Sequence, residues 1–133
     1  MTVATPMKLE FPAEMRAQNR WLVRVSHKNA KVPRSPLPKK PDGYVPKRAD
    51  EHPNAWRSRW NQPCVWAPYD LARRYYEKFP EKCDGLTFVL HAAGETGVTV
   101  RYVCLDFDNA FDADGNLYPE VRAILEMFDS YVE

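Results

Sequence analysis

The feature that most restricts the fold of this chain is a proline-rich stretch over residues 26–62. It contains a single glycine and six prolines, at Pro33, Pro36, Pro38, Pro41, Pro46 and Pro53. Each proline removes a backbone hydrogen-bond donor and biases the residue before it away from the helical conformation. The stretch is therefore predicted to be extended or looped, and its length is typical of a functional or a flexible loop.

Regular secondary structure is predicted on both sides of this stretch. The aromatic and β-branched residues at 20–25 predict a short strand. Pro68 and Asp70 suit the first turn of a helix, and Pro80 ends it. Residues 86–90 predict a second strand.

A hairpin and a second helix are predicted in the last third of the chain. Residues 98–108 form the longest strand candidate, and a turn-rich connector at 93–97 pairs it with residues 86–90. Residues 112–116 have the composition of a turn. Pro119 then starts a helix whose buried face is expected to carry four apolar side chains, Val121, Ile124, Leu125 and Phe128.

The predicted fold class is α/β of the α+β kind: a small, mostly antiparallel sheet flanked by helices, in a single domain over residues 1–133. Trp21, Trp66 and Cys104 are expected in its core. Residues 130–133 resemble the exit from the last helix into another strand, so the domain is expected to be incomplete at that point.

Charge is distributed unevenly along the chain, although the net charge is only +1. Residues 1–62 carry thirteen Lys or Arg and five Asp or Glu, whereas residues 105–133 carry one basic and eight acidic side chains. This gradient indicates a polyanion or a nucleotide on one side and a cation on the other. Two solvated faces of opposite sign are the alternative interpretation.

Composition excludes several classes of protein. The sequence has neither an apolar run long enough to span a membrane nor a secretory signal, so no membrane partner is expected. Three cysteines, Cys64, Cys83 and Cys104, lack the spacing of zinc ligands. Such cysteine usage is typical of a reducing compartment and predicts a cytoplasmic protein.

Two aspartates end the longest predicted strand, which is expected to be central because both of its faces are apolar. Side chains alternate between the faces of a strand, so Asp106 and Asp108 would project side by side from one face. Adjacent carboxylates repel each other and resist burial, and a divalent cation such as Mg²⁺ removes that conflict. Alternatively, Asp108 caps the following turn and Asp106 accepts backbone hydrogen bonds. The spacing leaves both interpretations open.

Five segments of the chain are informative when they are taken together in their order along the sequence. They lie at residues 20–23, 31–33, 64–72, 84–90 and 103–108. The last contains a hydrophobic-Asp-x-Asp motif, and residues 115–133 continue the series. In this order they resemble the bifunctional primase-polymerases of phages, plasmids and integrated elements, which belong to the archaeo-eukaryotic primase superfamily. The resemblance covers the chain from Trp21 onward and depends on the order of the segments, since each alone is common.

This resemblance implies the N-terminal part of a replication primase-polymerase from a mobile element, which performs template-directed nucleotidyl transfer. Asp106 and Asp108 would be catalytic ligands of Mg²⁺ or Mn²⁺. The implied partners are a nucleoside triphosphate, a DNA primer-template or single-stranded DNA, and a replicative helicase, in the cytoplasm of a bacterium or of a phage-infected host. The family also uses a histidine and a third acid downstream. The sequence ends before both, so the chain is expected to be inactive alone.

Basic residues crowd the proline-rich stretch, with aromatic residues between them. Cations pair with phosphates and aromatic rings stack on exposed bases. The insert at residues 39–60, which is longer than the usual spacing of the family, is therefore a candidate DNA contact. The residues assigned to DNA or nucleotide binding are Lys31, Arg34, Lys39, Lys40, Arg57 and Arg59, with Tyr44, Trp56 and Trp60 as stacking candidates. The alternative is a solubilising loop whose tryptophans pack on the body.

Two further functions are open at this level. A non-catalytic remnant would bind DNA or a replication partner without chemistry. A metal-dependent nuclease-like domain would use the same aspartate pair. Nuclease sites often add a downstream Glu-x-Lys on the next strand, and no such step follows Asp108.

Overall fold

The computed structural model describes residues 11–91 and 104–127. The chain divides into two compact units, Met1–Arg101 and Tyr102–Glu133. The first contains α1 (Ala13–Arg16), β1 (Trp21–His27), β2 (Ala30–Arg34), the 3-10 helices η1 (Ala55–Ser58) and η2 (Pro63–Val65), α2 (Tyr69–Lys78) and β3 (Gly85–Phe88). The second contains α3 (Pro119–Met127). The expectation of a single domain stays a prediction.

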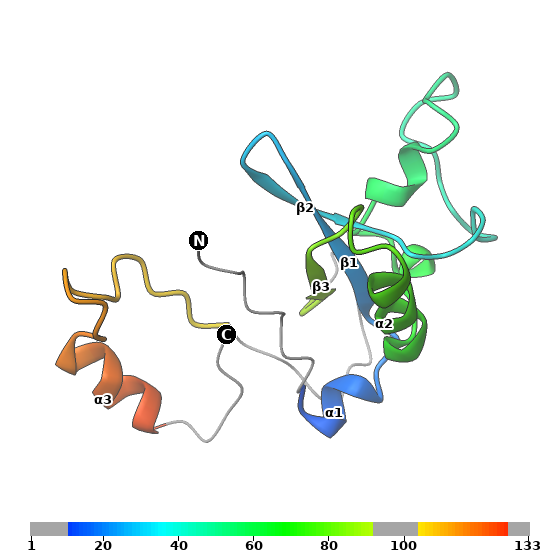
Figure 1. Ribbon diagram of the computed structural model, residues 1–133. Coiled ribbons are helices and arrows are strands. Elements are labelled where there is room, and N and C mark those ends of the chain that lie inside the picture. The colour runs from blue at the N-terminus through cyan, green and yellow to red at the C-terminus, as the bar shows by residue number, and fades with distance from the viewer. Residues whose placement is uncertain (1–10, 92–103, 128–133) are drawn as a thin grey trace. The chain divides into compact units, whose positions relative to one another are not determined.

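The first unit is built on a three-stranded antiparallel sheet with the strand order β2-β1-β3 (Figure 1). Val25 of β1 lies opposite Val32 of β2, and Trp21 of β1 lies opposite Phe88 of β3. The predicted α+β fold with a small antiparallel sheet is therefore confirmed. Its central strand is β1, which pairs along both of its edges.

β2 lies inside the stretch that was predicted to be extended or looped, and its strand conformation at residues 30–34 agrees with that prediction. The 3-10 helix η1 at Ala55–Ser58 departs from it. Lys28 and Asn29 join β1 to β2 with φ values of 48° and 66°, the pattern of a type I′ turn. Asn adopts a positive φ readily and Lys does not, so this pair lacks the usual sequence signature of such a turn. Pro33 is tolerated because β2 is an edge strand of the described sheet.

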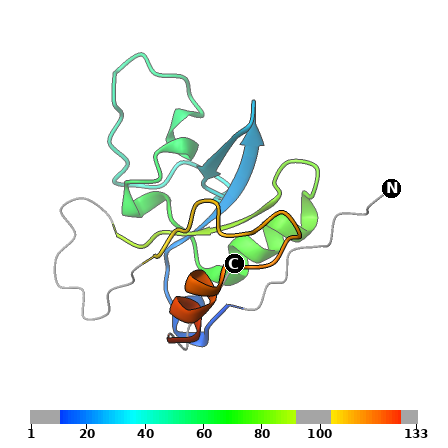
Figure 2. The ribbon, with the colours of Figure 1, turned by 90° about the vertical axis from the view of Figure 1, so that its left-hand side faces the viewer.

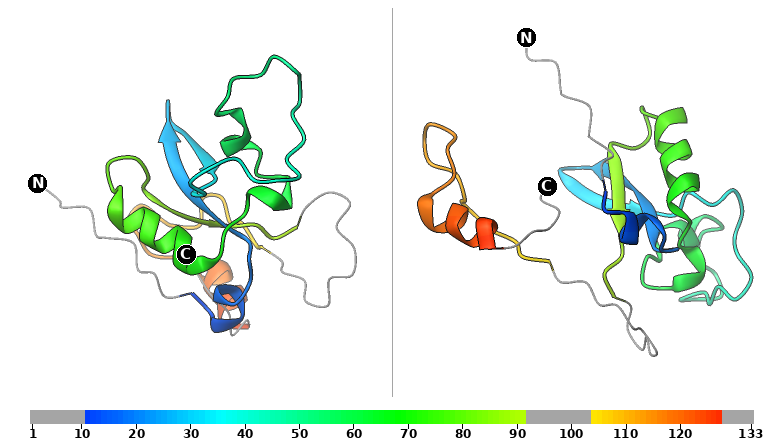
Figure 3. Two further views of the ribbon diagram at one scale, coloured as in Figure 1. Left: turned by 90° about the vertical axis from the view of Figure 1, so that its right-hand side faces the viewer. Right: turned by 90° about the horizontal axis from the view of Figure 1, so that it is seen from below.

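The predicted helix after Pro68 is confirmed as α2. Pro68 is its N-cap residue with an extended ψ of 152°, and Asp70 stands in the first turn, where a negative charge favours the helix dipole. The helix ends before Phe79. α2 contacts β1 and β3 and runs beside the sheet (Figure 3), with Ala72 fully buried.

An aromatic cluster covers one face of β1. Trp21 is completely buried, and its ring packs edge-to-face with Phe11 at 4.8 Å and with Tyr69 and Phe88 at 5.0 Å. Its indole Nε1 donates to the carbonyl of Met15, which ties the segment before β1 to the sheet. This cluster joins α2 to the sheet and confirms the prediction that Trp21 is a core residue.

A second cluster covers the other face of β1, because consecutive strand residues point to opposite sides. It is formed by fully or nearly fully buried side chains, Leu22, Trp56, Val65, Trp66 and Val89. The prediction that Trp66 lies in the core is confirmed. Trp56 from the predicted loop region thus completes this cluster, and Leu37 and Tyr44 of the same region pack against it. The loop itself extends outward from the sheet (Figure 2).

The second unit contains a tight turn followed by a helix. Asp112 Oδ1 accepts hydrogen bonds from the backbone N–H groups of Asp114 and Asn116, and Gly115 has a φ of 82°. Both features confirm the predicted turn. The predicted helix is confirmed as α3, but its expected buried face is not found in the described residues: Ile124 is 36% exposed and no residue of α3 is buried. Phe128 lies outside the described residues.

The prediction of a long strand that reaches Asp108 is wrong for residues 104–108. Residues 104–107 have no regular structure and Asp108 begins a turn, while residues 98–103 lie outside the described part. Cys104, expected in the core, is exposed, and Leu105 is 53% exposed. An apolar run with a period of two indicates which side chains would share a face, but it cannot identify the strand that would accept its hydrogen bonds.

Candidate functional site

The two predicted catalytic aspartates lie in the second unit, at the entry to a turn. Both side chains are exposed, and Asn109, directly after them, has a φ of 55°. Since residues 104–108 are not a strand, the argument that strand geometry aligns the two carboxylates no longer applies to them. The aspartates are nonetheless accessible to a solvated ion.

The donor set at this position fits a hard divalent cation only in part. Carboxylate oxygens are the ligands that Mg²⁺ and Mn²⁺ prefer, and Asp106 and Asp108 supply two of them. Within the residues that the structure describes, no group of three or more His, Cys, Asp or Glu side chains comes together in a manner that could hold a metal. The nearby Asp112 has its Oδ1 engaged by two backbone donors. A metal at Asp106 and Asp108 would therefore take further ligands from water or substrate.

The predicted DNA-binding residues are spread over β2 and the insert rather than gathered in one place in the fold. Lys31 on β2 and both Lys39 and Lys40 in the loop have exposed side chains. Arg34 ends β2 and is half-buried. These four cations are open to solvent to different degrees, and whether they contact DNA stays a prediction.

Arg57 has a clear structural role. Its Nη1 donates to the carbonyl oxygen of Leu37 at 2.7 Å and lies 3.5 Å from that of Ser35. Its guanidinium also lies over the Trp56 ring, 4.4 Å from the centroid. Much of its hydrogen-bonding capacity is thus used to hold the start of the insert.

The three stacking candidates differ in their accessibility. Trp56 is only 3% exposed and belongs to the core cluster, so its ring is not available to stack on a base. Tyr44 is half-buried and packs against the same cluster. Trp60 is 46% exposed, and it is the one tryptophan of the four with a substantially accessible ring. The alternative interpretation, in which tryptophans pack back on the body, is correct for Trp56.

The insert is held in place by hydrogen bonds from side chains to the backbone. The side chain of Gln62 forms two hydrogen bonds with the backbone of Val45. Its Nε2 donates to the carbonyl at 2.8 Å, and its oxygen accepts the N–H at 3.0 Å. The buried hydroxyl of Ser35 donates to the carbonyl of Val65 at 2.7 Å. These contacts satisfy backbone groups that no strand pairing satisfies, and together with the 3-10 helix η1 they give the insert a defined shape.

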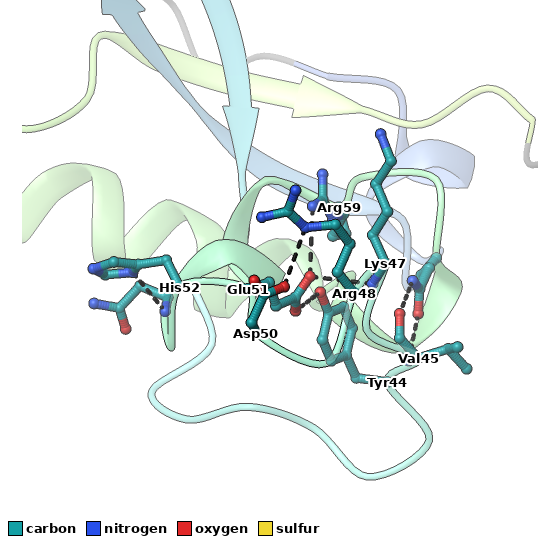
Figure 4. A network of polar contacts seen from close by, with 10 residues as sticks. Tyr44, Val45, Lys47, Arg48, Asp50, Glu51, His52 and Arg59 are labelled. Carbon is teal, nitrogen blue, oxygen red and sulfur yellow. Dashed lines mark hydrogen bonds and ion pairs between the residues drawn. The ribbon is translucent and has the colours of Figure 1, made fainter.

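A polar network at the tip of the insert is centred on Glu51 (Figure 4). Its carboxylate accepts hydrogen bonds from the Tyr44 hydroxyl and from the backbone N–H of Lys47, and it lies 3.5 Å from the Arg59 guanidinium. The hydrogen bond from Tyr44, with further contributions from Lys47 and Arg59, lowers the pKa of the Glu51 carboxyl. Burial, followed by the bond to Glu51, raises the pKa of the Tyr44 hydroxyl. Glu51 is therefore ionised and firmly positioned at neutral pH.

A cleft of about 320 Å³ opens beside this network. It is lined by Lys47, Arg48, Glu51, His52, Ala55 and Arg59. Of the predicted binding residues only Arg59 is among them. Sequence reasoning recognised the basic character of the segment but did not single out Glu51 or His52. The sequence offers no signal that separates Glu51 from the adjacent Asp50, because the role of either carboxylate depends on its partners in the fold.

Comparison with protein-family models, with curated proteins and with solved structures finds no match to this chain. In the described residues, none of the helices combines the length and the apolar character that crossing a membrane requires.

Proposed function

We propose that this chain carries the acidic motif of a primase-polymerase-type nucleotidyl transferase from a mobile element. The observation that carries the proposal is the ordered series of segments that ends in hydrophobic-Asp-x-Asp at residues 103–108. The secondary structure is compatible with that series, since β1, the start of α2 and β3 coincide with three of its segments. The accessibility of Asp106 and Asp108 is also compatible with a role as ligands.

In the proposed reaction, the oxygen of a 3′-hydroxyl forms a bond to the α-phosphorus of a nucleoside triphosphate and loses its proton to solvent. Pyrophosphate leaves with the electrons of the broken P–O bond. Asp106 and Asp108 would hold Mg²⁺ or Mn²⁺, which when bound neutralises charge on the phosphate oxygens. The histidine and the third acid of the family pattern do not occur in that context in this sequence. We therefore expect that these 133 residues alone do not extend a primer.

Metal binding provides the direct test. Mn²⁺ is titrated into the protein by calorimetry, with paramagnetic broadening as a second readout. Saturable binding is expected in the wild type and is lost in the double variant Asp106→Asn, Asp108→Asn. The control is Asp114→Asn, Glu120→Gln, which removes the same charge from exposed positions of the same unit. Equal binding by the wild type and the first variant would refute the metal site.

Primer extension tests the activity itself. With Mg²⁺ or Mn²⁺ and a primed template, the 133-residue chain is expected to give no product. Extension that disappears in Asp106→Ala would establish the polymerase function and would show that the expectation of inactivity is wrong.

A second candidate function, DNA binding without chemistry, is favoured by the exposed cations of the insert. Lys31, Lys39 and Lys40 present exposed side chains on one continuous stretch of chain. Binding of a labelled single strand is measured by fluorescence anisotropy at low salt. A loss of affinity in Lys39→Gln, Lys40→Gln is expected, and unchanged affinity would remove these two lysines from the proposed contact.

A further inference from the structure

The cleft at the tip of the insert has a strongly biased charge. Its lining contains three side chains of permanent positive charge, Lys47, Arg48 and Arg59, and a single carboxylate, that of Glu51. The cleft volume of about 320 Å³ is within the range of small-ligand sites. A concave site with this charge favours an anion with several oxygen acceptors, because each cation provides N–H donors and no acceptor.

The carboxylate of Glu51 does not cancel this bias at the mouth of the cleft. Its side chain is only 14% exposed, and both of its oxygens are engaged by the Tyr44 hydroxyl, the Lys47 N–H and Arg59. Its negative charge offsets one of the three positive charges, so the lining keeps a net positive charge. Glu51 acts as a positioning residue that holds the guanidinium of Arg59 at the wall of the cleft (Figure 4).

Arg59 still has donor capacity that the chain does not use. Its Nη2 faces Glu51, whereas its Nε is buried and has no hydrogen-bond partner among the described residues. A buried donor without an acceptor is unfavourable. An oxyanion that enters the cleft and shifts this guanidinium slightly would provide the missing acceptor.

The two outer cations are free to reorient toward a ligand. Arg48 forms an ion pair with Asp50 at 3.3 Å, but both side chains are more than 70% exposed, so the pair is weak and easily exchanged. Lys47 extends away from the loop in Figure 4, and none of the interactions drawn there involves its ammonium group. His52 accepts the N–H of Asn54 at its Nδ1, so the neutral ring carries its proton on Nε2 as a further donor.

We propose that this cleft is a phosphate-binding site in which Lys47, Arg48 and Arg59 bind the phosphate group of a nucleic-acid strand or of a free nucleotide. The cleft is formed entirely by the insert, so the proposal does not rest on Asp106 and Asp108. It assigns a function to residues that charge alone did not distinguish from the other cations of the stretch.

The test compares two double variants that lose the same charge from exposed positions of the first unit. Lys47→Gln, Arg48→Gln changes the cleft, and Lys78→Gln, Lys82→Gln changes the end of α2, where both lysines lie over the Phe79 ring. The probe is a labelled single strand of about 12 nucleotides, a length within the range of single-strand sites. Circular dichroism confirms that each variant is folded.

The expected size of the effect follows from counterion release. Each phosphate contact on a single strand contributes about 0.7 to the slope of log K against log salt. Two lost contacts therefore reduce that slope by about 1.4 and lower the affinity roughly 20-fold at about 0.1 M salt. The α2 variant should lose less than about threefold, since its lysines contribute only to the general field. Equal losses in both variants, or no loss in the cleft variant, overturn the proposal.

A second arm distinguishes the source of the phosphate and keeps the test decisive. If the labelled strand does not bind, the same variants are titrated with a nucleoside triphosphate by calorimetry. Binding that is lost only in the cleft variant assigns the site to a free nucleotide. Failure of both probes to bind the wild type overturns the proposal. Both arms are run in EDTA, so that the proposed metal site at Asp106 and Asp108 cannot contribute to the binding of either probe.

Discussion

Truncation of two leucines, one in each unit, tests the distribution of burial in this protein. Leu22 on β1 is completely buried in the cluster with Trp56, Val65, Trp66 and Val89. Leu105 in the second unit is 53% exposed. Leu22→Ala and Leu105→Ala remove the same three heavy atoms, so any difference in their effect on stability reports the surroundings of each side chain.

The free-energy cost of the two changes is expected to differ several-fold. Leu22→Ala loses the transfer free energy of its side chain and leaves a cavity under the indole rings, which together reduce the free energy of unfolding by about 3 kcal/mol. Leu105→Ala leaves no cavity and loses about half of the hydrophobic contribution, which limits its cost to about 1 kcal/mol. A loss of 3 kcal/mol is a large part of the stability of a domain of this size, typically about 5–15 kcal/mol.

Urea unfolding followed by two probes measures both changes. All four tryptophans, Trp21, Trp56, Trp60 and Trp66, lie in the first unit, so their fluorescence reports its unfolding. Circular dichroism reports the helices of both units. With a slope of about 2 kcal/mol per M urea, Leu22→Ala should lower the fluorescence midpoint by about 1.5 M. Leu105→Ala should leave that midpoint almost unchanged.

One result would refute this reasoning. If Leu105→Ala lowers the fluorescence midpoint as much as Leu22→Ala does, the stability of the first unit depends on Leu105, and the inference from the 53% exposure of its side chain fails.

Three further predictions follow from single contacts. Ser35→Ala should reduce the free energy of unfolding by about 1–3 kcal/mol, because it leaves the buried carbonyl of Val65 without its donor. Urea unfolding measures this change, and a reduction below about 0.5 kcal/mol would contradict the prediction. Hydrogen bonds from Ser26 and then Arg24 lower the pKa of the Asp84 carboxyl in the folded protein. Asp84 therefore stabilises the fold at pH values above its pKa in the unfolded chain, and this contribution is lost as the pH falls through its lower pKa in the folded protein. Because Asp84 is 46% exposed, Asp84→Asn should lower stability at pH 6 by no more than about 1 kcal/mol and flatten its decline below about pH 4. An unchanged pH profile would argue against the pair. Lys28→Asn with Asn29→Gly should raise the free energy of unfolding by about 1 kcal/mol, since both positions have a positive φ, which Asn and Gly adopt readily in this turn. A decrease in the thermal midpoint of unfolding would contradict the assigned turn.

Local sequence signals were sufficient for β1, α2, β3 and α3, but not for α1, β2 or the two 3-10 helices. The aromatic and β-branched residues of β1, the prolines on either side of α2 and the turn at Asp112 act through the backbone conformation of their own neighbourhood. Such effects do not depend on the rest of the fold. The hairpin turn at Lys28 and Asn29 was missed because it uses an unfavourable residue at a positive φ, which β1–β2 pairing stabilises.

The basic character of the insert and the presence of the acidic pair were also readable from composition and spacing alone, whereas the exposure of that pair was not. The partners of individual charges were not. Arg57 and Arg59 are near neighbours of one type, yet Arg57 is held by the carbonyls of Ser35 and Leu37 and Arg59 by the carboxylate of Glu51. Only the path of the insert decides which cation lines the cleft.

The sequence by itself thus determined where β1, α2, β3, α3 and the turn at Asp112 form, because these depend on residues close together in the chain. The tertiary structure decided that β1 is the central strand and that Trp56 belongs to the core. It also decided that Glu51 faces inward to position Arg59. Each of these properties depends on residues far apart in sequence, whose contacts no local pattern can specify. The same physical reason explains why residues 104–108, despite an apolar alternating pattern, are not a strand.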